Sequence, residues 1–240
     1  MEVNVRISDL GLRFFDSILG TFVGEGLQVT VHPAGFPHLK RALTSNLSGV
    51  YHLPPRLTNN EATHFSSPVM HVLTVEDPLR RYLPYTLNLS LPFKGLFDGG
   101  SGKGYLPLFP APAYPVAHGV RVHASLRTQT LDPMPWAVVR VTLGANGKAV
   151  SATGLADQNG EVYLSVPLPA YLPQSSKGLL EQAYAVKVQV GWDLTQKNNL
   201  IPELTGALGA TLADVTATPT TVSYGQPLIL RSAGSSFLQL

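Results

Sequence analysis

The sequence predicts an all-β protein, and three observations lead to this prediction. Charged residues make up 13% of the 240 residues, about half of the ~25% usual in globular proteins. The 22 glycines and 20 prolines favour short strands and tight turns over long helices. Several segments alternate apolar and polar residues with period two, which is typical of half-buried strands. A hydrophobic content of 44% excludes disorder caused by low hydrophobicity.

The clearest strand is predicted over residues 83–91, where every second residue is apolar and Pro84 marks a strand entry or a sheet edge. The same alternation predicts strands over 162–166 and 184–190. Apolar runs rich in β-branched residues over 69–75 and 137–143 predict more central strands.

Turn-forming residues separate these strands. Asn146-Gly147 predicts a two-residue hairpin. Asp157-Gln-Asn-Gly160 and Asn46-Leu-Ser-Gly49 have a common form, with a glycine available for a positive φ angle. One helix is expected within residues 200–215, although Gly206 and Gly209 weaken it by about 1 kcal/mol each relative to alanine. Its apolar stripe comprises Ile201, Leu204, Leu208 and Leu212.

The chain is expected to form two sandwiches, over residues 1–98 and 119–195, joined by a Gly/Pro-rich connector over 99–118. The second half of the connector is expected to be extended and to dock, because Leu106, Leu108 and Phe109 are apolar. Residues 196–240 are expected to form a tail with a short helix and strands, docked either on its own sandwich or on a partner.

The order of landmarks indicates an internal repeat. Residues 12–31 and 122–141 each begin and end with a strand, and a turn glycine follows after 18 residues in the first half (Gly49) and 19 in the second (Gly160). A chance similarity of turn spacing between all-β halves remains the alternative.

Charge and composition exclude several classes of protein. The net charge is +2 and no run of lysine or arginine exceeds two residues, so we expect no nucleic-acid partner. The absence of cysteine excludes disulfides, cysteine zinc sites and iron–sulfur clusters. No apolar run approaches the ~20 residues that span a bilayer, and no secretory signal is visible at the start. We therefore expect assembly in the cytoplasm.

No pattern of metal-ligating residues emerges. No two of the histidines have the spacing that places two ligands on one strand or helix face. They are His32, His38, His52, His64, His71, His118 and His123. We expect them to be scattered.

Catalytic patterns are also missing from the sequence. The segment around Lys103 resembles a phosphate loop, but Phe97 and Gly104 stand where that motif needs Gly and Ser or Thr. Ser101 lacks a nucleophile elbow, and Glu76-Asp77 precedes Pro78 as a turn. We expect no catalytic, cofactor or metal residues and no enzyme, unless Ser, His and acidic side chains converge in the fold to form a cryptic hydrolase.

The aromatic residues are dispersed along the chain. Trp136 stands at a strand start and Trp192 at a strand end. Such positions are more typical of core or rim residues than of a carbohydrate-binding platform.

The second half resembles the carboxypeptidase-regulatory-like, transthyretin-like module over about 50 residues. The residues that carry the resemblance are Pro135-Trp-Ala-Val-Val-Arg-Val141 and Gly154-Leu-Ala-Asp157-Gln-Asn-Gly160-Glu-Val162-Tyr-Leu164. The resemblance implies an immunoglobulin/transthyretin-like β-sandwich and implies no activity.

Residues 20–170 are similar to proteins of phage-tail-like contractile injection systems, through Val75-Glu-Asp77-Pro-Leu-Arg-Arg81-Tyr-Leu-Pro84, Leu91-Pro-Phe-Lys-Gly-Leu-Phe97 and Val122-His-Ala-Ser-Leu-Arg127. The resemblance implies a non-enzymatic structural subunit at the cap or tail-terminator end, in a homo-oligomeric ring with sheath, tube, cap or baseplate proteins as partners. The alternatives are a baseplate-associated component and a cell-surface or polysaccharide-binding protein.

Overall fold

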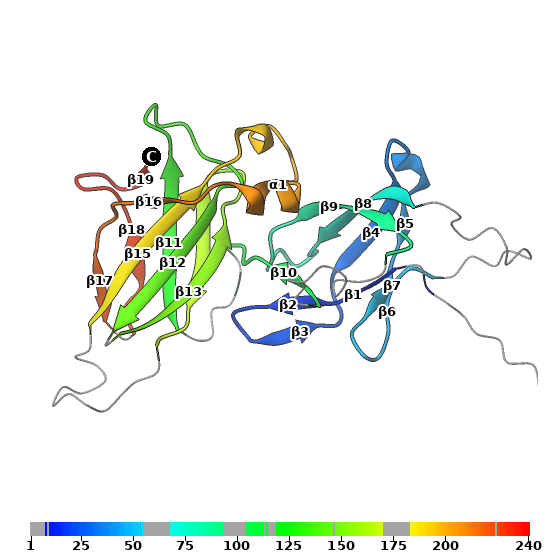
Figure 1. Cartoon of the computed structure of the whole chain (residues 1–240), viewed down its shortest axis with the longest axis horizontal. Helices are drawn as coiled ribbons and strands as arrows, with labels where there is room; N and C mark the ends of the chain where they lie inside the picture. Colours follow the sequence, from blue (N-terminus) through cyan, green and yellow to red (C-terminus); the bar gives the residue numbers. More distant parts are fainter. Residues whose placement is uncertain are drawn as a thin grey trace, which may run out of the picture. The chain divides into compact units, whose positions relative to one another are not determined.

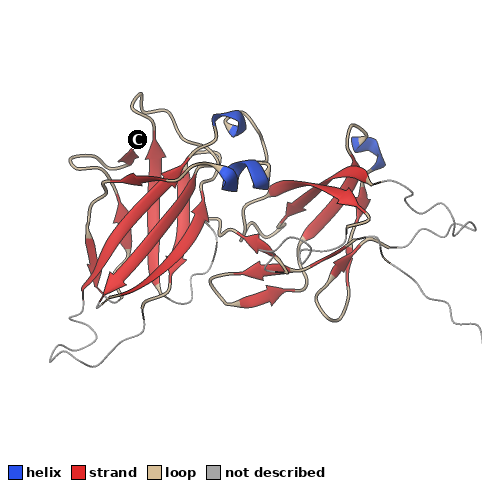
Figure 2. Cartoon of the chain, viewed as in Figure 1, coloured by secondary structure: helices blue, strands red, loops and turns tan. Residues whose placement is uncertain are grey.

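The computed structural model describes residues 8, 10–54, 68–93, 104–112, 114, 119–145, 147–169, 183–223 and 225–240. Strands dominate these residues, so the predicted all-β class is confirmed (Figures 1 and 2). The chain divides into two compact units. Unit 1 comprises Met1–Leu79 and Pro84–Leu108, and unit 2 comprises Arg80–Leu83 and Phe109–Leu240. No helix in the described ranges is long and apolar enough to cross a membrane.

Unit 2 is a sandwich of two sheets. The first has the order β14-β11-β18, with β19 also paired to β11, and the second has the order β13-β12-β15-β16, with β17 also paired to β15. The bounds are β11 (Val120–Arg127), β12 (Val138–Ala145), β13 (Lys148–Leu155), β14 (Glu161–Val166), β15 (Ala183–Gly191), β16 (Ala213–Val215), β17 (Thr221–Ser223), β18 (Leu228–Leu230) and β19 (Leu238–Gln239).

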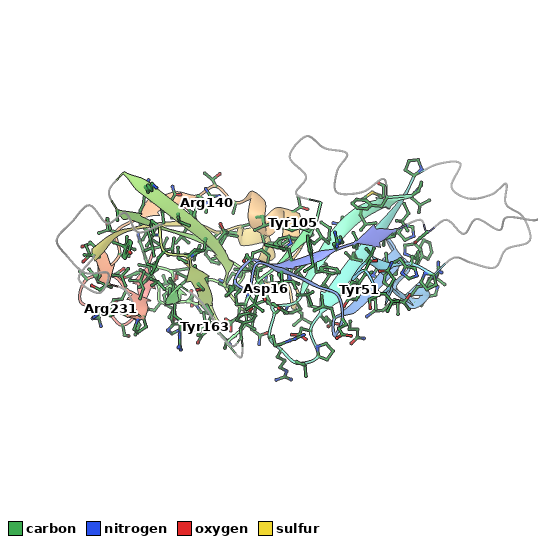
Figure 3. The ribbon with its side chains drawn as sticks, turned by 90° about the horizontal axis from the view of Figure 1, so that it is seen from below. Asp16, Tyr51, Tyr105, Arg140, Tyr163 and Arg231 are labelled. Carbon is green, nitrogen blue, oxygen red and sulfur yellow. The ribbon has the colours of Figure 1, made fainter. Side chains whose placement is uncertain are left out.

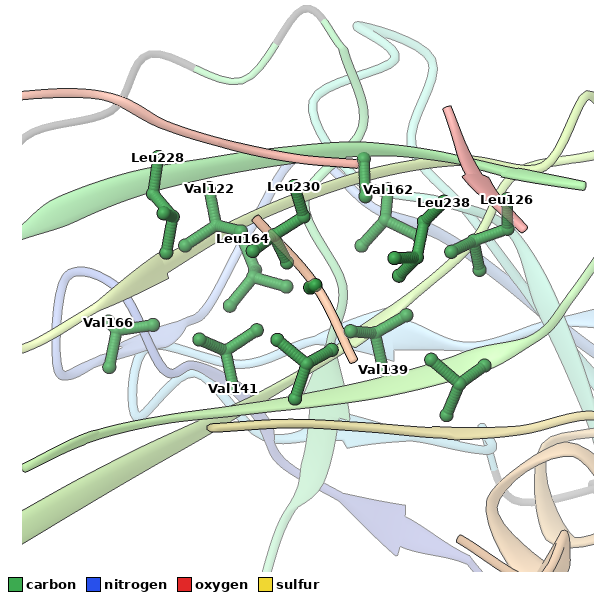
Figure 4. Close-up of a cluster of buried hydrophobic side chains, with 14 of the residues drawn as sticks. Val122, Leu126, Val139, Val141, Val162, Leu164, Val166, Leu228, Leu230 and Leu238 are labelled. Atoms are coloured by element: carbon green, nitrogen blue, oxygen red, sulfur yellow. The ribbon is translucent and has the colours of Figure 1, made fainter. Parts of the chain in front are cut away.

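The core of unit 2 lies between these sheets (Figure 4). Alternate residues of each strand point inward, as the period-two pattern requires. Val122, Leu126, Val141, Val162 and Leu230 are examples, each at most 2% exposed. Fully burying a side chain of this size contributes about 1.5–3 kcal/mol, so this core is the main source of the unit's stability in a chain without cysteine.

Unit 1 has a four-stranded sheet in the order β5-β4-β8-β9 and two three-stranded sheets, β1-β7-β6 and β10-β2-β3. Buried residues such as Phe14, Val31, Leu73 and Tyr85 fill its interior. The bounds are β1 (Gly11–Leu12), β2 (Phe14–Asp16), β3 (Thr21–Val23), β4 (Gln28–Pro33), β5 (Arg41–Ala42), β6 (Thr44–Ser45), β7 (Tyr51–His52), β8 (Val69–Glu76), β9 (Tyr85–Leu91) and β10 (Leu106–Leu108).

The two units share part of their strand topology. The first strand pairs antiparallel with the strand that follows the glycine turn, as β1 with β7 and β11 with β14. The last strands pair in parallel with a strand near the start of the unit, as β10 with the second strand β2 in unit 1 and as β18 and β19 with the first strand β11 in unit 2. The other sheets, β5-β4-β8-β9 and β13-β12-β15-β16, match in chain order. This agreement favours duplication over chance turn spacing.

The two predicted glycine turns form the same hydrogen bonds. Gly49 N donates to Asn46 O over 2.9 Å, and Gly160 N donates to Asp157 O over 3.1 Å. In each turn the side-chain Oδ1 of the first residue accepts the backbone N–H four residues later, over 3.0 Å at Asn46 and 2.9 Å at Asp157. Both glycines have positive φ angles, +70° and +77°, a conformation that glycine adopts without steric cost.

The predicted strands are present, with β9, β14, β15, β8 and β12 covering the expected segments. β9 is at a sheet edge, as the position of Pro84 predicted. The two-residue hairpin is confirmed by the pairing of Ala145 with Lys148. The second half of the 99–118 segment docks as expected, because β10 pairs with β2 and buries Leu106 and Leu108.

The short helix expected within 200–215 is present but does not reach Ile201 or Leu212 of its expected apolar stripe. Helix α1 spans only Leu204–Gly209, and Ala213–Val215 forms β16, which pairs with β15. Pairing with a tertiary neighbour outweighs a weak local helix preference here. Residues 213–239 also add β17, β18 and β19 to unit 2, so the described C-terminal segment docks on its own sandwich.

Candidate functional site

The described histidines do not converge. His32 lies on β4, His38 in the 3-10 helix Pro37–Leu39, His52 on β7, His71 on β8 and His123 on β11. His71 is buried, with Nδ1 2.8 Å from Val69 O. His64 and His118 lie outside the described residues. No three His, Asp or Glu side chains in the described part of the chain are grouped to hold a metal ion.

Other residues singled out in the sequence occupy structural positions. Asp77 follows the end of β8, and its Oδ1 accepts the backbone N–H of Leu79 over 3.2 Å, so the predicted turn is confirmed. Ser101 and Lys103 lie outside the described residues.

A polar cluster lies on the outer face of β11 and β14 (Tyr163 is labelled in Figure 3). His123 stacks on Tyr163 with ring centroids 4.6 Å apart, and its Nε2 lies 2.9 Å from Glu161 Oε2. Arg127 Nη2 is 3.7 Å from Glu161 Oε1. Partial burial raises the pKa of Tyr163, and the nearby carboxylates of Glu161 and Asp157 raise it further.

This cluster holds a base and an acid but does not form a catalytic triad. A triad histidine hydrogen-bonds the nucleophile through one ring nitrogen and the acid through the other. Ser125 pairs with Glu161 across the strands, whereas His123 bonds Glu161 through Nε2. Among the described hydrogen bonds, none joins Ser125 to His123. The cluster therefore resembles a cross-strand polar contact on a sheet face.

An aromatic cluster covers the outer face of β2 and β3 in unit 1, and sequence analysis missed it. Phe15 and Phe22 face each other across the strands, with ring centroids 5.4 Å apart. Tyr105, labelled in Figure 3, packs on Phe15 at 4.5 Å. The guanidinium carbon of Arg13 lies 4.2 Å from the centroid of Phe22, a cation–π distance. Phe22 is nevertheless 45% exposed.

An open groove of about 790 Å³ adjoins Phe22. Phe22 on β3, together with Gly24 and Glu25 just after that strand, forms one wall, and residues 45–49 form the other. A Cβ atom on Gly24 would lie only 2.9 Å from the Gly49 Cα. The backbones of these two glycines are therefore in close contact where the two walls approach each other. Leu47 projects from the turn and is fully exposed. We call this feature the Phe22–Leu47 groove.

The Phe22–Leu47 groove is preorganised. Asn46 Oδ1 accepts the N–H groups of Ser48 and Val50, each over 3.0 Å. The Asp16 carboxylate accepts the N–H groups of Ile18 and Leu19 at the β2–β3 hairpin. Exposed apolar side chains on a fixed backbone lose little conformational entropy on binding. The groove therefore exposes apolar side chains on a hydrogen-bonded backbone.

A second apolar surface lies in unit 2, on the segment 192–209 between β15 and β16. Leu194 is 66% exposed and Leu200 is 86% exposed. Two tryptophans hold this part of the unit: Trp136 Nε1 donates to Asn199 O over 2.8 Å, and Trp192 Nε1 donates to Pro135 O over 2.9 Å. Trp136 is buried and Trp192 half-buried, so their predicted placement in the core and rim is confirmed.

Comparison with known proteins gives little further information. No protein family profile matches the sequence, and no curated protein matches it. Among solved structures, a C-terminal fragment of the pilus adhesin SpaC from Lactobacillus rhamnosus GG is similar with 11% identity and a TM-score of 0.20, covering 92% of this chain and 95% of that one. A putative adhesin from Bacteroides ovatus has 10% identity and a TM-score of 0.20, covering 96% of this chain and 92% of that one.

Proposed function

We propose that this protein is a non-enzymatic structural subunit of a phage-tail-like contractile injection particle, at its cap or tail-terminator end. The observation that carries the assembly role is the Phe22–Leu47 groove, where exposed apolar side chains are held on a fixed backbone. Apolar side chains held in place at a surface mark sites of protein association. The assignment to this kind of particle depends on the sequence resemblance over residues 20–170.

The ring geometry favours a protein partner over a sugar. Stacking on a sugar needs an accessible ring face, and a platform needs several rings in one plane. Phe22 is edge-on to Phe15 at 67° and to Tyr105 at 76°, and Arg13 covers one of its faces. These rings pack on one another, and they present an irregular apolar surface that suits an apolar side chain.

The test is incorporation into particles. The native gene cluster is expressed with this protein tagged, and particles are pelleted by ultracentrifugation and imaged. We expect the tag to sediment with sheathed tubes and to label one end. Leu47→Ser should deplete the protein from the pellet without unfolding it, because Leu47 is fully exposed. Leu131→Asn, at another exposed leucine with a φ angle of +69°, is the matched control.

A soluble, monomeric protein beside intact particles that form without it would contradict the proposal. A glycan array probed with the same purified protein then tests the alternative of a surface protein that binds polysaccharide.

A further inference from the structure

A hairpin loop of unit 1 holds apolar side chains in solvent. Residues 34–40 connect β4 to β5, and every one of them is exposed. The loop contains the 3-10 helix Pro37–Leu39, which Figure 2 shows as a short helix at one end of the four-stranded sheet. The Leu39 N–H donates to Phe36 O over 3.1 Å, so the loop that carries these two apolar residues has a hydrogen-bonded backbone.

The start of β8 extends this apolar surface. The Ala34 N–H donates to Met70 O over 2.9 Å, so the loop and the first residues of β8 lie side by side. Val69, beside Met70, is also exposed. We call Phe36, Leu39, Val69 and Met70 the apolar tip, and its four side chains are 42–54% exposed. Single apolar residues are common on protein surfaces, whereas a group of them marks an interaction site.

The charges of unit 1 are divided between the two ends of this sheet. Lys40 ends the loop, is exposed and has no ion-pair partner among the described residues. The Glu76-Asp77 pair lies at the other end of β8, six residues beyond Met70 or about 20 Å along a strand. Glu25 lies at that far end too, because it precedes β4, whose Gln28 is opposite Glu76.

The other titratable groups around the loop add no negative charge. Arg41 Nη2 donates to Pro54 O over 2.7 Å. The ring centroids of His38 and Phe36 are 6.1 Å apart, and His32 Nδ1 lies 3.0 Å from Pro33 O. Among the described residues, the apolar tip is therefore bordered by cationic or neutral groups.

This arrangement matches the layers of an anionic lipid bilayer. Phenylalanine and leucine side chains are stable at the boundary between headgroups and acyl chains. A lysine beside them keeps its ammonium group at the phosphates while its stem covers apolar surface, and an anionic leaflet attracts it. A protein partner would need a pocket shaped to a convex loop, whereas a fluid bilayer accommodates a convex apolar loop of any detailed shape.

We propose that the apolar tip of unit 1 inserts into the interface of an anionic phospholipid bilayer, with Lys40 at the phosphate groups. This contact goes beyond the proposed function and does not depend on it. Residues 24 and 25 of the Phe22–Leu47 groove precede β4, and the loop follows it. Within unit 1, these residues of the groove and the apolar tip therefore lie at opposite ends of one strand.

Vesicle co-sedimentation of the purified full chain tests the proposal. One acyl chain binds membranes with an association constant of about 10⁴ M⁻¹, so lipid concentrations up to about 5 mM cover the expected range. The vesicles contain phosphatidylcholine with about 30% phosphatidylglycerol. We expect the wild-type protein to pellet with them, and Phe36→Ser to weaken binding about tenfold or more. Leu79→Ser, at an exposed leucine beyond the other end of β8, is the matched control and should bind as the wild type does.

The charge is tested with a second lipid composition. Lys40→Gln should weaken binding to the anionic vesicles about fivefold and leave binding to phosphatidylcholine alone unchanged. Lys148→Gln, at an exposed lysine on β13, should change neither.

Tryptophan fluorescence separates insertion from adsorption to the surface. Phe36→Trp should show a blue shift of emission when anionic vesicles are added, because the new indole leaves water for the interface. Leu79→Trp should show none. The wild-type protein, whose tryptophans both lie in unit 2, gives the baseline.

A wild-type protein that stays in the supernatant with anionic vesicles would overturn the proposal. Equal losses of binding in Phe36→Ser and Leu79→Ser would overturn it as well. If wild-type protein ignores vesicles while Phe36→Ser is depleted from particles, the apolar tip is a protein contact instead. Incorporation of the wild-type protein into particles is measured separately, so failure of the bilayer contact and failure of the proposed function are distinguishable.

Discussion

Replacing Gly160 with alanine should destabilise unit 2 because this position has no room for a Cβ atom. The added atom would lie 2.7 Å from the Leu126 carbonyl oxygen and 3.0 Å from the Met134 nitrogen. Both are backbone atoms of neighbouring segments, so neither can swing aside. Forcing such an overlap costs about 1–3 kcal/mol, and the left-handed φ angle of +77° costs an alanine roughly 1–2 kcal/mol more.

Gly147 is the matched control for the backbone conformation. Its φ angle is +75°, but a Cβ atom there would meet nothing within 4 Å. Gly147→Ala therefore carries only the conformational cost, roughly 1–2 kcal/mol. We expect Gly160→Ala to exceed it by about 1–3 kcal/mol, the part that belongs to the clash.

Urea unfolding followed by tryptophan fluorescence measures this difference. The chain has two tryptophans, and both Trp136 and Trp192 lie in unit 2, so the signal reports the unit that carries both substitutions. Equal losses of unfolding free energy in the two variants would refute the steric argument and show that the neighbouring backbone yields easily.

Four further outcomes are expected. Tyr85→Phe should raise the unfolding free energy of unit 1 by about 1 kcal/mol in calorimetry, because the buried hydroxyl has no hydrogen-bond partner among the described residues; a loss of stability would contradict this. Burial raises the pKa of this tyrosine, so the wild-type protein should also lose stability as the pH rises above about 10, where an unfolded tyrosine ionises, and Tyr85→Phe should lose less. Asp157→Ala should cost about 1–3 kcal/mol in urea unfolding by removing the acceptor of two backbone N–H groups, whereas Asp157→Asn should retain most of the stability. Glu161→Gln should lower the pKa of Tyr163 while leaving it above that of a free tyrosine, because burial is the larger cause; an unchanged phenolate titration in ultraviolet absorbance would refute this.

Apolar alternation and turn-forming residues predicted the strands and turns, because these elements depend mainly on residues close together in the sequence. Alternation located β9, β14 and β15, and the turn residues located both glycine turns. The landmarks 46–51 and 157–163 even indicated the repeat that the matching topology now supports.

Long-range contacts explain what the sequence did not predict. Residues 213–215 extend a sheet because β15 offers them an edge, and no pattern within 200–215 encodes that neighbour. The aromatic cluster depends on Arg13 lying over Phe22 and on Tyr105 reaching β2 from a distant segment. One signal was visible: Leu47 is an apolar residue in the middle of the polar turn Asn46-Leu-Ser-Gly49.

The parallel pairing of an early strand with the last strands of each unit has a mechanical consequence. In unit 2, β18 and β19 run alongside β11 in the same direction, so the unit's two chain ends emerge from opposite ends of that ladder. Tension applied between them pulls along the strands, and the ladder's hydrogen bonds are loaded together in shear rather than peeled open one at a time. The same holds for β10 and β2 in unit 1. Each unit is thus built to resist stretching along the chain.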